Sequence, residues 1–212
     1  MGMKGQMYII AGIIIVVVLV LLKTSLNLTR IIEDKRSLEY QLEKLEFENL
    51  KNEEIYTLEI SYTQEKNTSD NIISFTRFAR NSFSSRAKEL DGVIVCSYIN
   101  NVTANENTTL NVSVLNILGD TMKSLNLTFN GSTQNFIDVS DNSVAKANFT
   151  FNTSTDVNYT LSIVYETSYE NDTEEILIPV SVGKSKFVGF FDLRLKNDIG
   201  KVREKFTKTI TF

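Results

Sequence analysis

MGMKGQMYIIAGIIIVVVLVLLK, residues 1–23, is the stretch that decides how this chain is organised. One basic residue, Lys4, precedes an uninterrupted apolar run from Met7 to Leu22, and Lys23 closes the run. As a helix, these 16 residues would span roughly 24 Å, close to the ~30 Å hydrocarbon core of a bilayer. The sequence therefore predicts a transmembrane anchor over residues 1–23, with the lipid bilayer as its partner.

Three interpretations of this anchor compete. A cleaved secretory signal would need a shorter apolar core and a small-x-small cleavage site. An uncleaved signal anchor fits the run directly. The third interpretation comes from Lys4-Gly5-Gln6, directly before the apolar run, which resembles the class III signal peptide of archaeal type IV pilin-like proteins. The resemblance implies that a prepilin-type peptidase cuts between Gly5 and Gln6, and that the apolar helix stays on the mature protein.

The sequence departs from the family pattern just after the expected cleavage point. The Ser and Glu that the family has three and five residues into the mature chain are Tyr8 and Ile10 here. The resemblance assigns to that Glu the neutralisation of a neighbour's N-terminal amine in the helical core of a filament. Its absence leaves open a minor pilin, or a pilin-like protein that remains in the membrane.

The composition excludes several classes of function. A net charge of -4 gives no electrostatic footprint for nucleic acid. The chain has no His, the usual general base and the commonest metal ligand. Its one Cys, Cys96, can form neither an internal disulfide nor a thiolate metal cluster. Because the sequence also lacks a Gly-rich phosphate loop, we expect no enzyme activity, no cofactor and no metal site.

Residues 24–52 are predicted to continue the anchor as a helical stem, because they contain many strong helix formers and neither Gly nor Pro. Apolar side chains recur there at three- and four-residue spacing, namely at Leu28, Ile31, Leu38, Leu42 and Leu45. This stripe fits a coiled-coil or pilin-type stem that packs against pilin-like or surface protein partners. It also fits a helix that lies on its own domain, and the polar interruptions of the stripe favour this second arrangement.

A second helix is predicted over about residues 70–90. The segment before it, IYTLEISY at residues 55–62, fits either a strand or the end of a helix. The predicted helix has one buried stripe, formed by Ile72, Phe75, Phe78, Ala79, Phe83, Ala87 and Leu90. Residues 93–99 then form a short buried strand, in which Cys96 is expected to be a core residue and not a nucleophile.

From about residue 93 to residue 212 the chain is predicted to form strands. Apolar and polar residues alternate, as in LNLTF at residues 125–129, and turn residues such as Asn130-Gly131 separate the segments. This period of two is typical of antiparallel sheets with one solvated face. The predicted fold class is α+β: an N-terminal transmembrane helix with a helical stem, one further helix and an antiparallel β-sandwich-like domain of about eight strands. The extracytoplasmic domain is expected to span residues 53–212.

The strands also carry many Asn-x-Ser/Thr sequons. Eleven of the 21 Asn residues begin one, against about four expected from the Ser and Thr content. Alternating strands can create sequons without any modification, but Asn is a poor strand former that Thr or Lys would replace better. Besides Asn27 and Asn67, the candidate glycosylation sites are Asn101, Asn107, Asn111, Asn126, Asn130, Asn148, Asn152, Asn158 and Asn171.

These patterns predict a single-pass cell-membrane protein with a cytoplasmic N-terminus and an extracellular C-terminal domain. The topology rests on the sequons and on the export-type start of the chain, because the basic residues that follow the anchor outnumber Lys4. We expect a pilin-like structural or assembly component of the cell surface. The alternative is a signal-anchored adhesion or binding module with a β-sandwich. A cut between Gly5 and Gln6 favours the first function, and an uncut monomer with a sugar- or protein-binding surface favours the second.

Overall fold

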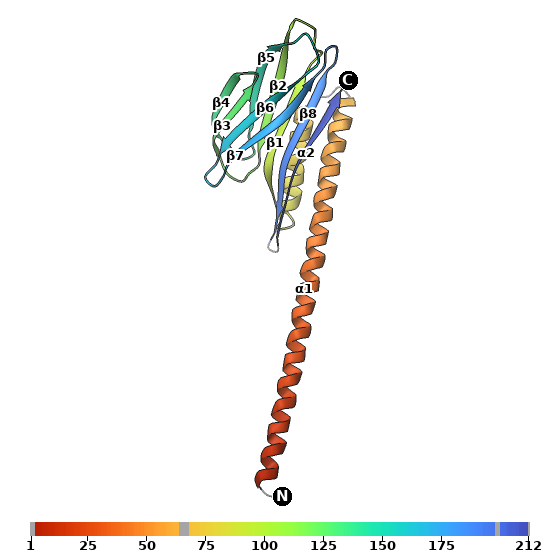
Figure 1. The fold of residues 1–212 in the computed structure, drawn as a ribbon, viewed down its shortest axis with the longest axis vertical. Coiled ribbons are helices and arrows are strands. Elements are labelled where there is room, and N and C mark those ends of the chain that lie inside the picture. The colour runs from red at the N-terminus through yellow and green to blue at the C-terminus, as the bar shows by residue number, and fades with distance from the viewer. Residues whose placement is uncertain (1–2, 64–67, 198–199, 212) are drawn as a thin grey trace. The chain divides into compact units, whose positions relative to one another are not determined.

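A computed structural model describes residues 3–63, 68–197 and 200–211 of the chain (Figure 1). The chain divides into two compact units, Met1–Leu45 and Glu46–Phe212. Helix α1, Met3–Thr63, contributes to both of them. Beyond Gly12 this helix contains neither Gly nor Pro, so no residue in it favours a break in the backbone hydrogen bonding.

The described part of the first unit is helical throughout. Its side chains from Ile15 to Leu22 are all apolar and 48–63% exposed, an arrangement that is unfavourable in water and suits hydrocarbon. By length and composition, α1 contains a stretch that could cross a membrane. The apolar side chains of the predicted stem stripe are also exposed, at Leu28, Ile31, Leu38, Leu42 and Leu45.

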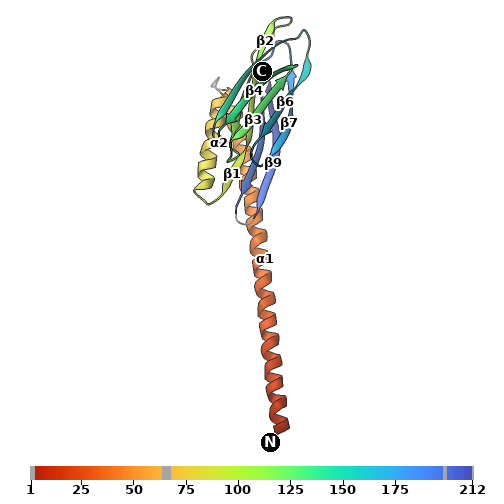
Figure 2. The same cartoon turned by 90° about the vertical axis from the view of Figure 1, so that its left-hand side faces the viewer.

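The second unit combines the last part of α1 with a second helix and two antiparallel sheets (Figures 1 and 2). The second helix is α2, Thr68–Ser84. The described strands are β1 Glu89–Ile99, β2 Asn107–Asn116, β3 Met122–Phe129, β4 Ser132–Val139, β5 Val144–Asn152, β6 Val157–Glu166, β7 Asn171–Val180, β8 Lys186–Lys196 and β9 Lys201–Thr211. They form a five-stranded sheet of order β5-β2-β1-β8-β9 and a four-stranded sheet of order β4-β3-β6-β7. The predicted α+β class with an antiparallel sandwich is confirmed.

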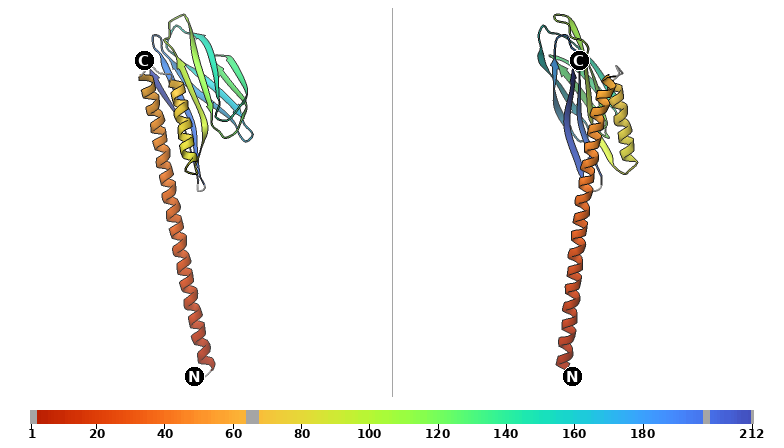
Figure 3. Two further views of the ribbon diagram at one scale, coloured as in Figure 1. Left: turned by 180° about the vertical axis from the view of Figure 1, so that it is seen from behind. Right: turned by 90° about the vertical axis from the view of Figure 1, so that its right-hand side faces the viewer.

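Two hydrophobic cores hold this unit together. One lies between the two sheets and includes Leu127 and Phe129 of β3. The other lies on the opposite face of the five-stranded sheet and includes Leu58 of α1, Ile72 of α2 and Phe191 of β8. Figure 3 shows the last part of α1 and α2 side by side on that face. The second unit is therefore three layers deep, with the five-stranded sheet in the middle.

The place of each strand in these layers explains its sequence pattern. β3 has one face on the inter-sheet core, so buried Leu125 and Leu127 alternate with half-buried Asn126. β8 is covered on both faces, and 10 of its 11 residues are buried. β1 lies beside β8, and a Cβ at Gly92 of β1 would stand 2.1 Å from the carbonyl oxygen of Asp192. Only glycine allows the two central strands to approach this closely.

The second helix differs from its predicted bounds of about 70–90. It ends at Ser84, Ala87 takes a φ of 57° in the turn that follows, and Leu90 lies on β1. Phe78, predicted to lie in the buried stripe, is 68% exposed. The residues that α2 buries are centred on Thr76, and Phe78, two residues further along the helix, lies on the opposite side.

Core packing decides two further boundaries, and the structure adds one strand. Residues 55–62 belong to α1, because Leu58 is fully buried in the helix-sheet core. The second unit begins at Glu46 and not at residue 53, since Phe47 of α1 also fills that core. β4 was not apparent from the sequence. It is an edge strand with most of its residues exposed, so it lacks the alternation that marks β3.

Candidate functional site

The candidate glycosylation sites lie on the surface of the second unit. Eight of the nine are exposed, and Asn126 is half-buried. Strands β2, β3, β5, β6 and β7 and their adjoining loops carry them, at Asn101, Asn107, Asn111, Asn126, Asn130, Asn148, Asn152, Asn158 and Asn171. Asn27 is exposed on α1, and Asn67 lies outside the described residues.

The asparagines that begin the candidate sequons differ from those whose side chains form hydrogen bonds within the fold. Among the described residues, five Asn side chains form hydrogen bonds within the fold, and none of them begins a sequon: Asn71, Asn100, Asn116, Asn142 and Asn197. Asn116 is fully buried, and its amide donates to the carbonyl oxygens of Asp120 at 2.8 Å and Val139 at 2.9 Å. Within the part of the chain that the structure describes, the nine candidate sites form no such side-chain bond. Their amides face solvent.

A second polar group, for which the sequence pattern gives no direct indication, lies where β7, β8 and β9 come together. Asp192 on β8 is buried and accepts hydrogen bonds from Nε of Arg203 at 2.8 Å and from its Nη2 at 2.5 Å. Arg203, on β9, also contacts Asp172 on β7 at 3.2 Å. Lys205 on β9 pairs with Glu174 on β7. This network joins the β9 edge of one sheet to the β7 edge of the other.

Arg194 extends the network into the inter-sheet core. Its side chain is 4% exposed and forms a bidentate salt bridge with Glu170. This is the strongest common geometry for an Arg–carboxylate pair. The Arg194 guanidinium holds the pKa of Glu170 below its usual value. Burial, together with the nearby carboxylates, raises the pKa of the Tyr165 hydroxyl, which is neutral at pH 7.

Three carboxylates of the network could in principle share a cation. Oxygens of Asp172, Glu174 and Asp192 lie within 4.8 Å of one another. All three already form salt bridges with Arg203 or Lys205, so a metal ion would have to displace two positive side chains. Partial burial opposes ionisation of Asp172, but Lys205 and Arg203 outweigh it and lower its pKa. We interpret the group as a salt-bridge network that closes this side of the sandwich.

A buried carboxyl group lies in the core between the helices and the five-stranded sheet. Glu54 of α1 is 0% exposed, and its Oε1 lies 2.6 Å from Oγ1 of Thr76 on α2. Its Oε2 has no hydrogen-bond partner among the residues that the structure describes. Burial raises the pKa of Glu54 to about 8, although the contact with Thr76 acts in the opposite direction. Oγ1 of Thr76 also lies 2.9 Å from the carbonyl oxygen of Ile72. Because a hydroxyl has one hydrogen, both contacts are satisfied when Glu54 is protonated and donates to Thr76.

Cys96 lies in the same core, on β1, and is buried. The predicted core position is confirmed. Burial, followed by the proximity of Glu54, raises the pKa of the thiol. This is the reverse of the shift that an activated cysteine requires.

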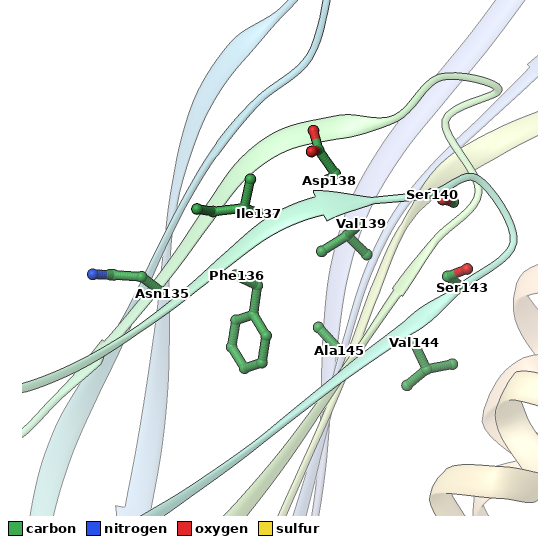
Figure 4. Close-up of a pocket in the computed structure, with 9 residues that line it drawn as sticks. All are labelled: Asn135, Phe136, Ile137, Asp138, Val139, Ser140, Ser143, Val144 and Ala145. Atoms are coloured by element: carbon green, nitrogen blue, oxygen red, sulfur yellow. The ribbon is translucent and has the colours of Figure 1, made fainter.

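A shallow groove runs between the edge strands β4 and β5 (Figure 4). Phe136 and Val139 point toward Ala145 across the groove, while Ile137 and Asp138 point away from it. Asp138 is the one carboxylate of the lining. Without a second titratable group beside it, this lining offers apolar contact and no acid–base pair.

The predicted processing residues, Gly5 and Gln6, lie in the first turns of α1, directly before its apolar run. No protein-family model matches the chain, and no curated protein matches it. The function is therefore inferred from the residues and geometry of this chain.

Proposed function

We propose that this protein is a single-pass membrane protein and a pilin-like structural or assembly component of the cell surface. Its N-terminus lies in the cytoplasm and its second unit outside the cell. The observation that carries the proposal is helix α1. One uninterrupted helix supplies the exposed apolar segment and also part of the core of the folded unit.

Because α1 contributes to both units, this chain differs from a folded domain that a flexible linker joins to its anchor. Phe47, Leu50 and Leu58 of α1 are at most 6% exposed, and burying each such side chain is worth about 1.5–3 kcal/mol. The folded unit thus depends on the same element that continues toward the anchor, with no linker between them. The resemblance of Lys4-Gly5-Gln6 to a class III signal adds to this, because that family keeps its apolar helix after processing. Both observations favour a pilin-like component over a separately anchored adhesion module.

The residues after the expected cleavage point bear on which kind of pilin-like component we propose. Tyr8 and Ile10 stand where the family has Ser and Glu. A chain without that Glu lacks the carboxylate that would neutralise a neighbour's N-terminal amine in a filament core. We therefore propose a minor pilin-like component, or one that stays in the membrane, and not the main subunit of a homopolymer.

The sequon residues support the extracellular placement. Their amides are exposed or half-buried and form no hydrogen bonds within the described fold, whereas five other asparagines carry out that structural role. A glycan requires a solvent-facing amide. We propose that some of these sites are glycosylated in the native host.

The N-terminal mass of the membrane-extracted protein tests the pilin-like function. Coexpression with a prepilin-type peptidase should yield a chain that begins at Gln6 and remains in the membrane fraction. Gly5→Val should abolish the cut, while the matched control Gly2→Val should leave it unchanged. An intact Met1, or a cut beyond Leu22, would contradict the pilin-like proposal.

A persistent Met1 start would instead favour the adhesion or binding module. In that case the membrane-extracted protein should be a monomer, and its sandwich should bind a sugar or protein ligand. A chain cut at Gln6 that elutes with other surface components argues for assembly.

A further inference from the structure

Four of the sequons face one another in pairs across two neighbouring strands. In the antiparallel register of β2 and β5, Asn107 is opposite Asn152 and Asn111 is opposite Asn148. All four side chains are exposed. On the same face of the sheet, Thr109 and Thr150 lie between these two pairs and are also opposite each other. Two pairs of candidate glycosylation sites therefore lie along the same two strands, and we call this row of paired Asn and Thr residues the ladder.

The ladder lies on the outer face of the five-stranded sheet. Leu110 and Val112, the neighbours of Asn111 on β2, are buried in the inter-sheet core, so Asn111 points the other way. α2 reaches the near end of this face, where Asp70 lies 3.6 Å from Lys146 of β5. Beyond Lys146 the ladder is open to solvent, because its Asn and Thr side chains are all exposed.

We propose that each of these two pairs, Asn107 with Asn152 and Asn111 with Asn148, accepts one glycan and not two. The face with four sequons would then carry at most two glycans. This inference rests on the extracellular placement and glycosylation proposed above.

The spacing of the pairs is the reason. Directly opposite residues of an antiparallel pair have Cβ atoms about 4.5–5.5 Å apart. A branched sugar on one Asn covers the amide of the residue opposite, since an N-linked glycan is bulky and begins at the amide nitrogen itself. Two glycans on one pair would therefore compete for the same volume above the sheet.

The pairing of β5 with β2 prevents the two strands from moving apart to make room for a second glycan. β5 is the edge strand and pairs with β2 along its whole length, from Asn107 opposite Asn152 to Leu115 opposite Val144. On its other side, the amide of Gln134 donates to the backbone oxygen of Asn148 at 2.6 Å. If both members of a pair were modified before folding, β5 could not close on β2 without crowding the two sugars.

The chemistry requires a lipid-linked sugar phosphate as donor. The Asn Nδ2 forms a bond to the anomeric carbon of the sugar, and the bond between that carbon and the phosphate oxygen breaks. The lipid phosphate leaves with the electron pair of the broken bond, and an Nδ2 proton passes to a base of the transferase. Apart from the Ser or Thr that completes each sequon, no step requires a further group on this protein. Access of the transferase to the Asn and to that hydroxyl therefore decides which site is modified.

Site occupancy in protein from the native host tests the inference. Mass spectrometry of its peptides should give occupancies of Asn107 and Asn152 that sum to no more than one, and likewise for Asn111 and Asn148. Asn107→Gln should raise the occupancy of Asn152, about twofold if the two share the glycan equally. The control Asn130→Gln, at a turn without an opposing sequon, should leave Asn152 unchanged.

A sum well above one within a pair would overturn the pairing rule while leaving glycosylation in place. An unchanged occupancy of Asn152 in Asn107→Gln would also overturn it. Absence of glycan from all nine candidate sites would remove the rule together with the proposed glycosylation. The cut at Gln6 is measured separately and is unaffected by either result.

Discussion

Replacing Glu54 by glutamine should remove a pH dependence that is built into the helix-sheet core. In the folded unit the carboxyl is 0% exposed and contacts Thr76, and its pKa is raised from 4.5 to about 8. Glutamine has nearly the same shape and stays neutral at every pH. Its amide group can donate to Thr76 in place of the carboxyl O–H. The substitution therefore changes the titration and leaves the packing almost intact.

The sign and size of the effect follow from the two pKa values. Because the folded state binds the Glu54 proton more tightly than the unfolded state, its contribution to stability is complete below pH 4.5 and is lost as the pH rises to about 8. Each pH unit in this window costs about 1.4 kcal/mol. The loss is thus roughly 5 kcal/mol over the whole window, and roughly 3 kcal/mol of it has occurred by pH 7.

Urea unfolding of residues 46–212, followed by far-ultraviolet circular dichroism at pH 5 to 9, measures this difference. At pH 5, Glu54→Gln and the wild type should agree to within about 1 kcal/mol. At pH 8 the variant should be more stable by several kcal/mol, since only the wild type has an acid that ionises in the core. Glu53→Gln, on the exposed side of the same helix, serves as the control and should follow the wild type. Parallel curves for Glu54→Gln and the wild type across this range would refute the reasoning.

Three further predictions concern the fold. Phe129→Ala should destabilise the second unit by about 3–5 kcal/mol, as large core truncations do, while Thr128→Ala on the outer face should change stability by no more than about 0.5 kcal/mol in the same unfolding assay. Equal effects would contradict the alternation of β3. A chain that begins at Glu46 should melt cooperatively in calorimetry, and one that begins at Glu53 should melt at a lower temperature or not cooperatively, because it lacks two core side chains of α1. Asp192→Asn should destabilise the second unit by about 1.5–3 kcal/mol, because Arg203 loses charge-assisted hydrogen bonds to a buried carboxylate. Asp172 still pairs with Arg203, and Glu170 still pairs with Arg194. A loss below about 0.5 kcal/mol in urea unfolding would show that the network does not stabilise the fold.

The sequence predicts those parts of the fold in which one face of an element is buried and the other is wet. β3 is such an element, and its period of two is confirmed from Ser124 to Phe129. β4 is not, because as an edge strand it exposes most of both faces and leaves no periodic signal. The sequence pattern predicts that α2 ends near residue 90, later than it does, because Leu90 continues the helical spacing by chance while it belongs to β1.

The polar groups inside the fold were harder to predict, because they depend on which strands become neighbours. Asp192 and Arg194 are a recognisable signal, since two charges at alternate positions of an otherwise apolar strand must find buried partners. Arg203, the partner of Asp192, lies on β9, and Glu170, the partner of Arg194, lies directly before β7. Only the folded structure shows that these segments meet. Glu54 is similar, because a Glu among helix formers looks like a solvated residue until Thr76 is placed beside it.

The way α1 enters the second unit also determines how that unit bears mechanical load. In the membrane-anchored arrangement proposed above, tension on the anchor would reach the folded unit at residue 46. The contacts of α1 are distributed from Phe47 to Leu58, and Glu59 adds a salt bridge of 2.8 Å to Lys208 on β9. A pull along the helix axis strains these contacts in parallel, so they must rupture together, whereas contacts strained one after another peel apart at low force. The packed part of α1 is therefore expected to resist axial tension as one cooperative unit.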